Sequence, residues 1–301
     1  MNRILGSILG GAIGDCLGGP HEGGKPPFVF SHQFEWRISD DTQLTLATCE
    51  AISKNKRVDP QGISETFAAW HRSARFTGLG ASTYKALSEL CIGGHWALVG
   101  RRGERAAGNG AAMRIAPLAF CLDPKDLTAR TVIRDICRIT HHHDEAYVGA
   151  LAVVMAIREG LNGNWQGESN LLPLVIDHLP DSSVRDRLSE LTKVNESVSL
   201  KELASQLGAS GYVVESVPLA LYASQRLKKL GFAKLMEELI LAGGDTDTIA
   251  SIAGQITGAI IGQDGLPEEW KAKLPDREMI LSIAQKFASI VLERFRSFTI
   301  H

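Results

Sequence analysis

The stretch that decides the fold lies at residues 243–261, which read GGDTDTIASIAGQITGAII. From Ile249 to Ile261, small residues (Ala, Gly and Ser) are mixed with isoleucines. This composition predicts a buried helix whose small side chains let a neighbouring helix approach closely. Val148–Ala156 has the same character. The two segments therefore favour an all-α core.

Apolar side chains recur at helical spacing along most of the chain. Within Leu127–Ile139, for example, Ile133 and Ile136 fall on one helical face. Helices are also predicted at Thr42–Ile52, Gln61–Arg72, Ala81–Cys91, Gly110–Cys121, Asp144–Glu159, Leu219–Leu227, Phe232–Leu241, Asp247–Ile261 and Arg277–Arg296. No alternating pattern bounded by hairpin turns predicts a strand. We expect one all-α domain over residues 1–301, with a less regular segment between residues 160 and 208.

Composition and charge exclude several classes of function. The 301 residues contain 32 Lys and Arg against 34 Asp and Glu, a formal net charge of -2. A protein that binds nucleic acid in bulk or a membrane surface needs an excess of basic residues, which this chain lacks. The five cysteines form no CxxC pair, as is typical of reduced thiols. The apolar run Ile4–Ile13 contains glycines and is followed by Asp15, which argues against a signal peptide. We expect a soluble, cytoplasmic protein that does not span a membrane.

Two short segments rich in carboxylates each precede a predicted helix. They are Ser39–Thr42, with sequence SDDT, and Asp245–Thr248, with sequence DTDT. Either one alone could simply cap its helix. If the fold brings both together, four carboxylates converge, and their repulsion requires protonation or bound divalent cations. Because all the ligands are oxygen atoms, the segments favour Mg²⁺ or Mn²⁺, with room for two ions about 4 Å apart.

Three further segments could contact a ligand, although each has an ordinary structural explanation. Gly10–Gly18 is rich in glycine and is followed by Glu22; its glycines could permit close helix packing instead. Gly108–Arg114 leads into a predicted helix, whose free N–H groups suit a phosphate or diphosphate, or Asn109 could merely cap it. His141–His143 follows a predicted helix, where an imidazolium is a common structural device. One of these histidines could instead face a ligand.

Taken in order, these motifs resemble the ADP-ribosylglycohydrolase superfamily, which includes dinitrogenase-reductase-activating glycohydrolase and the ADP-ribosylarginine and ADP-ribosylserine hydrolases. The similarity runs from Gly10 to about Gly258. It rests on the motifs Gly14-Asp15-x-x-Gly18 with Glu22, Ser39-Asp40-Asp41-Thr42, Gly108-Asn109-Gly110-Ala111-Ala112-Met113-Arg114, Thr140-His141, Gly211-Tyr212-Val213-Val214-Glu215 and Gly244-Asp245-Thr246-Asp247-Thr248. The last of these motifs is the most specific.

The resemblance implies a fold, a metal centre and a set of site residues. The fold is a compact, single-domain, orthogonal helical bundle, and the centre holds two Mg²⁺ or Mn²⁺ ions. The implied metal ligands are Ser39, Asp40, Asp41, Asp245, Asp247 and Thr248. The implied substrate-binding residues are Asp15, Gly108, Asn109, Gly110 and His141, with the glycine loop at the diphosphate and His141 near the adenosine. Glu22 and Asp41 are the implied catalytic carboxylates, either of which could orient the attacking water.

The expected activity is metal-dependent hydrolysis of the C1″ glycosidic bond of an ADP-ribosylated protein side chain, with arginine favoured over serine. Such a reaction develops oxocarbenium character on the ribose, so the site must align the sugar and deliver water. The alternatives are a hydrolase of small ADP-ribosyl or nucleotide conjugates and a non-catalytic ADP-ribose-binding protein. We expect a monomer whose partners are ADP-ribose and ADP-ribosylated protein. Ala106 and Ala107 leave no acid or aromatic group just before Gly108, and Trp36 is either an aromatic wall or part of the core.

Overall fold

The computed structural model describes residues 1–24 and 29–294. In this part of the chain nearly all regular structure is helical, which confirms the predicted all-α class. The helices are α1 (Asn2–Gly18), α2 (Asp40–Asn55), α3 (Pro60–Arg72), α4 (Ala81–Cys91), α5 (Leu127–Arg138), α6 (Asp144–Leu161), α7 (Leu171–Ile176), α8 (Ser183–Leu191), α9 (Leu200–Leu207), α10 (Val213–Ser224), α11 (Leu227–Ala242), α12 (Thr246–Ile261), α13 (Glu268–Lys273) and α14 (Arg277–Arg294). Two short strands, β1 (Arg101–Arg102) and β2 (His141–His142), pair in parallel.

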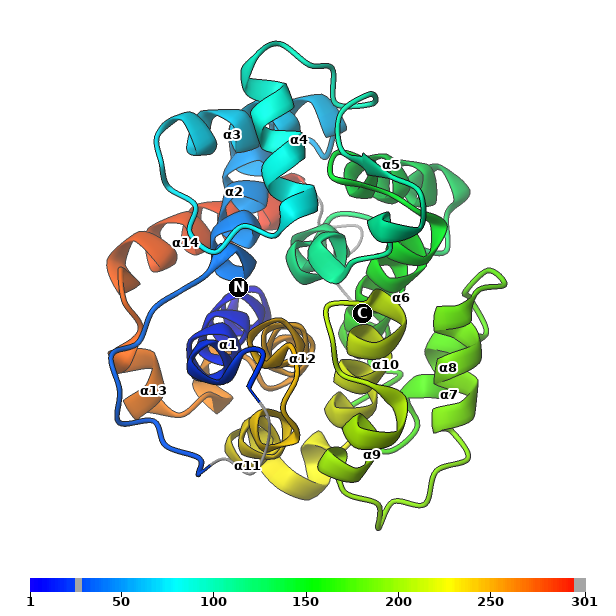
Figure 1. Cartoon of the computed structure of the whole chain (residues 1–301). Coiled ribbons are helices and arrows are strands. Elements are labelled where there is room, and N and C mark those ends of the chain that lie inside the picture. Colours follow the sequence, from blue (N-terminus) through cyan, green and yellow to red (C-terminus); the bar gives the residue numbers. More distant parts are fainter. Residues whose placement is uncertain (25–28, 295–301) are drawn as a thin grey trace.

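Helices α1 and α12 lie side by side at the centre of the bundle (Figure 1). Their contact is made by glycines: a Cβ on Gly10 would meet the carbonyl oxygen of Gly254, and one on Gly6 would meet that of Gly258. Backbones this close leave no room for side chains between them. The small residues that the sequence places after Asp247 are therefore used to bring these two helices together.

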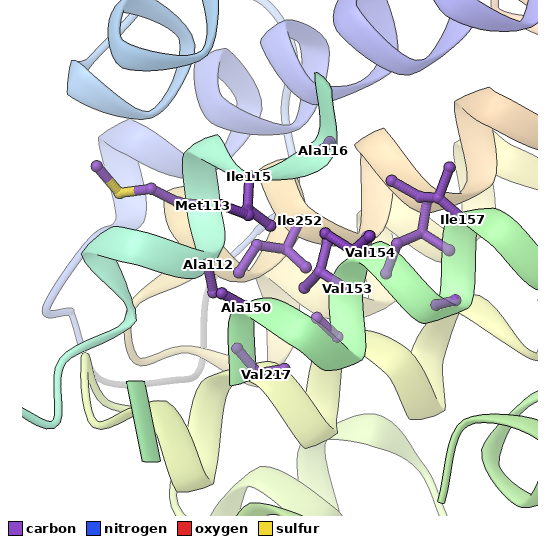
Figure 2. Close-up of a cluster of buried hydrophobic side chains, with 14 of the residues drawn as sticks. Ala112, Met113, Ile115, Ala116, Ala150, Val153, Val154, Ile157, Val217 and Ile252 are labelled. Atoms are coloured by element: carbon purple, nitrogen blue, oxygen red, sulfur yellow. The ribbon is translucent and has the colours of Figure 1, made fainter. Parts of the chain in front are cut away.

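The core surrounds this helix pair. Helix α2 and its neighbours α3 and α14 pack on one side, and α6 and α10 pack on the other (Figure 1). Figure 2 shows part of the core, where Ile115, Val153, Val217 and Ile252 gather from four different segments. Among the described residues, none of the helices combines the length and apolarity that crossing a membrane requires.

The predicted helix Gly110–Cys121 is wrong. The chain forms two successive 3₁₀ helices, Asn109–Arg114 and Ala116–Phe120, separated at Ile115. Pro117 lies in the first turn of the second 3₁₀ helix, where its missing N–H loses no bond, whereas a continuous α-helix would need that N–H. Both 3₁₀ helices are buried almost throughout.

Other helix predictions differ mainly at their ends. The pattern Leu219–Leu227 spans the end of α10 and the first residue of α11, and Gly231 (φ 74°) interrupts α11 just before Phe232. The segment between residues 160 and 208 contains the three short helices α7, α8 and α9. The last two residues of the predicted helix Arg277–Arg296 lie outside the described part of the chain. The single domain over residues 1–301 stays a prediction.

Candidate functional site

The start of α2 is fixed by a buried carboxylate from α1. Ser39 caps the helix, and its Oγ accepts a hydrogen bond from the Asp41 N–H at 3.3 Å. Asp15, only 1% exposed, accepts hydrogen bonds from the N–H groups of Ser39 (3.0 Å) and Thr42 (3.2 Å), and from the Thr42 hydroxyl. Asp40 and Asp41 occupy the first turn. Asp15 therefore fixes the first turn of α2 through the backbone N–H groups of that turn.

The start of α12 is fixed by a sharp backbone turn. Gly243 and Gly244 have φ values of 80° and 88°, which residues with a Cβ rarely adopt. The turn lets the Asp245 N–H donate to the Ala209 carbonyl at 2.7 Å. The Thr246 hydroxyl donates to the Gly18 carbonyl at the end of α1 at 2.8 Å. Asp245 is thus at the N-cap of α12, and Asp247 and Thr248 follow in its first turn.

The two acidic helix starts meet, although about 200 residues separate them in the sequence. The Thr248 hydroxyl donates to Asp41 Oδ2 at 3.1 Å, which joins α12 directly to α2. Carboxylate oxygens of Asp15, Asp41 and Asp247 lie within 4.8 Å of one another, as do those of Glu22, Asp245 and Asp247. The fold therefore gathers the predicted acidic residues into one cluster, here called the acid wall (Asp40, Asp41, Asp245 and Asp247).

Crowding raises the pKa of several carboxyls in this region. Burial, followed by the charge of Asp15, raises the pKa of Asp40 to about 7. Burial and the charge of Asp245 raise the pKa of Asp247 to about 9. The pKa of Asp41 is raised well above its usual value by burial and then by Asp247. Without a cation, the acid wall can therefore be accommodated only with some of its carboxyls protonated.

A divalent cation fits this donor set. Asp41 Oδ1 is buried and has no hydrogen-bond partner in the described part of the chain, although buried carboxylate oxygens are normally paired. None of the ion pairs formed within residues 1–24 and 29–294 includes a carboxylate of the acid wall. The available donors are carboxylate and hydroxyl oxygens, which suit hard cations. The unpaired oxygen and the missing basic partners are both accounted for by a bound metal.

The acid wall forms one side of a cavity of about 300 Å³. Another part of its lining, here called the donor wall, is made by Gly108–Gly110 and His141. Asn109 connects the two walls, because its Nδ2 donates to Asp245 Oδ2 at 2.7 Å and to Ser216 Oγ at 3.2 Å. The Asn109 N–H donates to the Gly211 carbonyl at 3.0 Å, which holds the loop against the start of α10.

One interpretation of the sequence placed the histidine run at the end of a helix. The structure does not place it there. Helix α5 ends at Arg138, and His141 and His142 form β2. His143 caps α6, where its Nδ1 accepts from the Glu145 N–H at 3.1 Å. Burial, with the nearby charge of Arg114, lowers the pKa of His141 to about 3. His141 is therefore a neutral imidazole in the cavity wall.

Two predicted site residues occupy different positions from the rest. Asp15 does not line the cavity and instead contacts the backbone of α2. Glu22 lies at the exposed rim beside Asp245 and Asp247, just after the 3₁₀ turn Gly19–His21. Burial and Asp245 raise the pKa of Glu22. Glu22 is the most exposed of these three carboxyls, since Asp245 is half-buried and Asp247 is buried, so it can exchange protons with solvent.

Trp36 is part of the core rather than a wall of the cavity. It is 6% exposed and stacks on Phe34 with ring centroids 6.2 Å apart. Ala106 and Ala107 are buried and bring no polar side chain to the cavity. Neither segment therefore supplies stacking or an acid to a ligand bound there.

Sequence reasoning missed the segment that begins α4. Gly78, Gly80 and Thr83 line the cavity, and the N-cap Gly80 leaves the first turn of α4 without a side-chain cap. The signal was present, because Gly78 and Gly80 precede a helical run as Gly108 and Gly110 precede theirs. Arg101, on β1, also lines the cavity, at the side of His141.

Comparisons with known proteins agree with this geometry. The sequence model described as ADP-ribosylglycohydrolase matches residues 1–296. The chain is 25% identical to ADP-ribosylhydrolase ARH3 of Xenopus tropicalis, over 99% of this chain and 98% of that protein. It is 27% identical to ADP-ribosylarginine hydrolase Tri1 of Pseudomonas putida (strain GB-1), over 95% of this chain and 78% of that protein. A solved structure described as an ADP-ribosylglycohydrolase-related protein complex superposes with a TM-score of 0.76 and 26% identity, covering 96% of this chain and 98% of that one.

Proposed function

The chain belongs to the ADP-ribosylglycohydrolase family, and from this premise we propose that it hydrolyses the C1″ glycosidic bond of ADP-ribosylated protein side chains, using two Mg²⁺ or Mn²⁺ ions and favouring arginine. The observation that carries the proposal is the pairing of opposite chemistries across one cavity. The acid wall suits cations and sugar hydroxyls, and the donor wall presents the Gly108–Gly110 loop and the His141 ring to a diphosphate.

The proposed substrate lies with its distal ribose at the acid wall and its diphosphate at the loop Gly108–Gly110. Ser39, Asp40, Asp41, Asp245, Asp247 and Thr248 are the residues that would hold the cations. When bound, the cations would supply positive charge that neutralises the acid wall and grips the 2″ and 3″ hydroxyls of the ribose. The backbone of Gly108–Gly110 and the Nε2 of His141 orient the remainder of the ligand, and Asn109 keeps the two walls in register through Asp245.

Glu22 is the better candidate of the two catalytic carboxylates. Asp41 Oδ2 already accepts hydrogen bonds from Ser39 (3.2 Å) and Thr248 (3.1 Å), so it is held in a fixed structural arrangement. Glu22 is exposed at the rim, and its raised pKa brings it closer to the pH at which a general base both accepts and returns a proton. We assign to Glu22 the orientation and deprotonation of the attacking water.

Arginine is the preferred modified residue because a guanidine leaves without needing a strong acid. An alkoxide leaving group such as that of serine requires protonation as the bond breaks. Besides Glu22, the carboxyls that line the described cavity are Asp40, Asp41, Asp245 and Asp247, all of which are assigned to the cations and not to protonating a leaving group. The site is therefore better suited to a leaving group that departs with little protonation.

The direct test is release of free ADP-ribose from an ADP-ribosylarginine protein, an ADP-ribosylserine peptide and small ADP-ribosyl conjugates. We expect turnover of the arginine substrate that EDTA abolishes, that added Mg²⁺ or Mn²⁺ restores, and that Asp245→Ala removes. Asp264→Ala is the matched control, because Asp264 is an exposed acid just beyond α12. Turnover that persists without divalent metal would contradict the proposed centre. ADP-ribose binding without turnover of any substrate would instead indicate a binding protein.

A further inference from the structure

Arg114, Thr140 and His141 form a hydrogen-bonded chain that ends at the cavity. Arg114 and Thr140 are both fully buried. Arg114 Nη2 donates to Thr140 Oγ1 at 2.9 Å and to the Ile136 carbonyl at 3.3 Å. Thr140 Oγ1 lies 2.8 Å from His141 Nδ1. The chain therefore runs from a buried cation, through one hydroxyl, to a ring in the donor wall.

The protons of this chain can be assigned by counting donors and acceptors. A guanidinium can only donate, so Thr140 Oγ1 must accept from Arg114. The Thr140 hydroxyl hydrogen then needs an acceptor, and His141 Nδ1 is the acceptor that the described residues provide. If Nδ1 carried the hydrogen instead, the Thr140 hydroxyl hydrogen would be buried without a partner. His141 Nδ1 therefore accepts, and the ring hydrogen is on Nε2.

The Nε2–H of His141 faces the glycine loop. A Cβ on Gly108 would lie 3.2 Å from Nε2, and a Cβ on Gly110 would lie 2.8 Å from Cε1. His141 lines the cavity, and its Nε2 has no hydrogen-bond partner in the described part of the chain. The ring thus offers one N–H donor beside the loop, at a place where neither glycine could carry a side chain without moving the ring.

The setting of Arg114 indicates that its charge serves this arrangement. Its Nε and Nη1 are buried without partners, and no carboxylate of the described residues pairs with it. Its Cζ lies 4.9 Å from the centroid of the Phe67 ring. A buried cation without a counter-ion is costly, so a role beyond packing is expected. Its nearness disfavours a second proton on His141.

We propose that Arg114 and Thr140 are positioning residues that hold His141 as the neutral Nε2–H tautomer, so that it donates a hydrogen bond to an acceptor oxygen of the bound ligand. The identity of that ligand as an ADP-ribosyl group rests on the proposed function. The tautomer itself does not, since it follows from contacts within the chain.

The test compares Thr140→Val, which removes the hydroxyl at nearly constant volume, with the conservative Thr140→Ser. Thr131→Val on the exposed side of α5 is the matched control. The readouts are the imidazole ¹⁵N shifts of His141, assigned with His141→Gln, and the affinity for ADP-ribose. We expect Nε2–H in the wild type, in Thr140→Ser and in the control. Thr140→Val should lose the single tautomer and bind ADP-ribose about tenfold more weakly, the effect of one hydrogen bond.

The two readouts separate the two ideas. If Thr140→Val keeps the Nε2–H tautomer, the proposed relay, in which Arg114 and Thr140 fix the tautomer of His141, is wrong whatever the affinity for ADP-ribose. If the tautomer changes as expected but the wild type does not bind ADP-ribose, the relay stands and the proposed function fails. A thermal unfolding curve for each variant shows that the fold is intact. If Thr140→Val does not fold, the wild-type spectrum decides, because an Nδ1–H ring in the wild type would overturn the proposed hydrogen-bonded chain.

A separate observation concerns a groove of about 600 Å³ that adjoins the cavity at Ala81 and Arg101. Three of its lining residues, Lys85, Arg101 and Arg102, are basic, and none is acidic. Lys85 pairs with Glu89, whereas Arg101 and Arg102 have no ion-pair partner within the described residues. Arg101 is paired in register with His141 in the two-stranded sheet, and its charge helps to lower the pKa of that histidine. The groove therefore adjoins the part of the cavity that contains His141 of the donor wall.

The geometry points to a subsite for a further phosphate carried on the adenosine half of the ligand, an inference that also rests on the proposed function. Two unpaired guanidiniums match a phosphate in charge and in hydrogen-bond donors. Because the distal ribose is assigned to the acid wall, the opposite end of an ADP-ribosyl group lies toward Arg101. We therefore assign Arg102, which lines the groove beside Arg101, to a phosphate monoester on the adenosine ribose.

Calorimetry with ADP-ribose and with 2′-phospho-ADP-ribose tests this subsite. The wild type should bind the phosphorylated ligand about tenfold more tightly at low salt, and the preference should shrink as salt is added. Arg102→Gln should remove the preference and leave the affinity for ADP-ribose unchanged, whereas Arg105→Gln, an exposed neighbour outside the groove, should keep it. Equal affinities in the wild type would overturn the subsite alone, and no binding of ADP-ribose would overturn the proposed function as well.

Discussion

The acid wall and the donor wall of the cavity are built in opposite ways. The acid wall crowds Asp40, Asp41 and Asp247 together, raises their pKa values and leaves Asp41 Oδ1 without a partner in the described structure. In the donor wall, the Asn109 N–H and His141 Nδ1 already have partners within the chain, and His141 is held neutral with its Nε2 left for a ligand. The donor wall is therefore held in place by hydrogen bonds within the chain. The acid wall instead brings carboxylates together whose repulsion a bound cation would reduce.

The largest effect is expected from Asp247→Asn. This change keeps the side-chain oxygen that accepts the Thr248 N–H at 2.9 Å and removes one charge from the acid wall. We expect hydrolysis of ADP-ribosylarginine to fall about 10³-fold, equal to about 4 kcal/mol in the barrier. The metal-free protein should nevertheless become more stable, with a rise in Tm of about 2 °C or more, because Asn is neutral without taking up the proton that folded Asp247 must bind near pH 7.

Activity assays and thermal unfolding in EDTA check these two outcomes together. Asp264→Asn, at an exposed position outside the cavity, serves as the control and should change neither quantity. A lower Tm for Asp247→Asn in EDTA would mean that this carboxyl supports the fold and that the acid wall is not under repulsion.

The second prediction uses the pH dependence of the metal-free protein. The pKa values of Asp40 (about 7) and Asp247 (about 9) are above the unfolded value near 3.8, so the folded protein keeps protons that the unfolded chain has lost. Stability from these groups is therefore fully present below about pH 3.8 and falls as pH rises, with the loss complete near pH 7 for Asp40 and near pH 9 for Asp247. The slope approaches about 1.4 kcal/mol per pH unit for each retained proton.

The pH dependence that His141 contributes to stability has the opposite sign. It limits the pH range in which the carboxyls can be measured. Its pKa is lowered to about 3 from the usual 6.5, so it destabilises the fold as pH falls below about 6. Denaturant unfolding in EDTA should therefore be compared between pH 7 and pH 9, where the carboxyls dominate. Added Mg²⁺ or Mn²⁺ should raise stability more at pH 9 than at pH 7. A stability that increases with pH across this window in EDTA would contradict the crowded acid wall.

The acidic residues of the acid wall could be predicted from the sequence, whereas the contacts that support them could not. Paired acids ahead of two helices identify Asp40 and Asp247 directly, because capping alone needs only one acid. The support from Asp15 could not be predicted, since nothing in the sequence says that its carboxylate faces the start of α2 rather than a ligand. Likewise, Pro117 breaks an apparently continuous helix, and only the folded chain shows that the 3₁₀ turns then place Arg114 against Thr140.

The third prediction concerns the glycine seam, which is the close contact of α1 with α12 through their glycines. This contact positions the start of α12 and its two acidic residues. A Cβ on Gly14 would meet the backbone carbonyl of Ala250 in α12, which cannot move aside as a side chain can. Gly14→Ala should therefore force α1 and α12 apart and destabilise the protein by about 2–3 kcal/mol. Gly19→Ala is the control, because φ is -50° there and a Cβ would meet nothing within 4 Å. Chemical denaturation curves for the two variants should differ clearly, and equal midpoints would show that the seam adjusts to a methyl group.

The smallest effect is expected at the donor wall, from Gly110→Ala. The added Cβ would lie 2.8 Å from Cε1 of His141, which is a side chain that can shift. Stability should change by less than about 1 kcal/mol, because the strain is relieved by moving the ring. The affinity for ADP-ribose should fall about fivefold, because the Nε2–H would no longer point at its acceptor. Calorimetry in the His141→Ala background decides the cause: with the ring absent, Gly110→Ala should cost almost nothing. An equal loss of affinity in both backgrounds would mean that the methyl group blocks the ligand directly, and that His141 is not the group through which Gly110 acts.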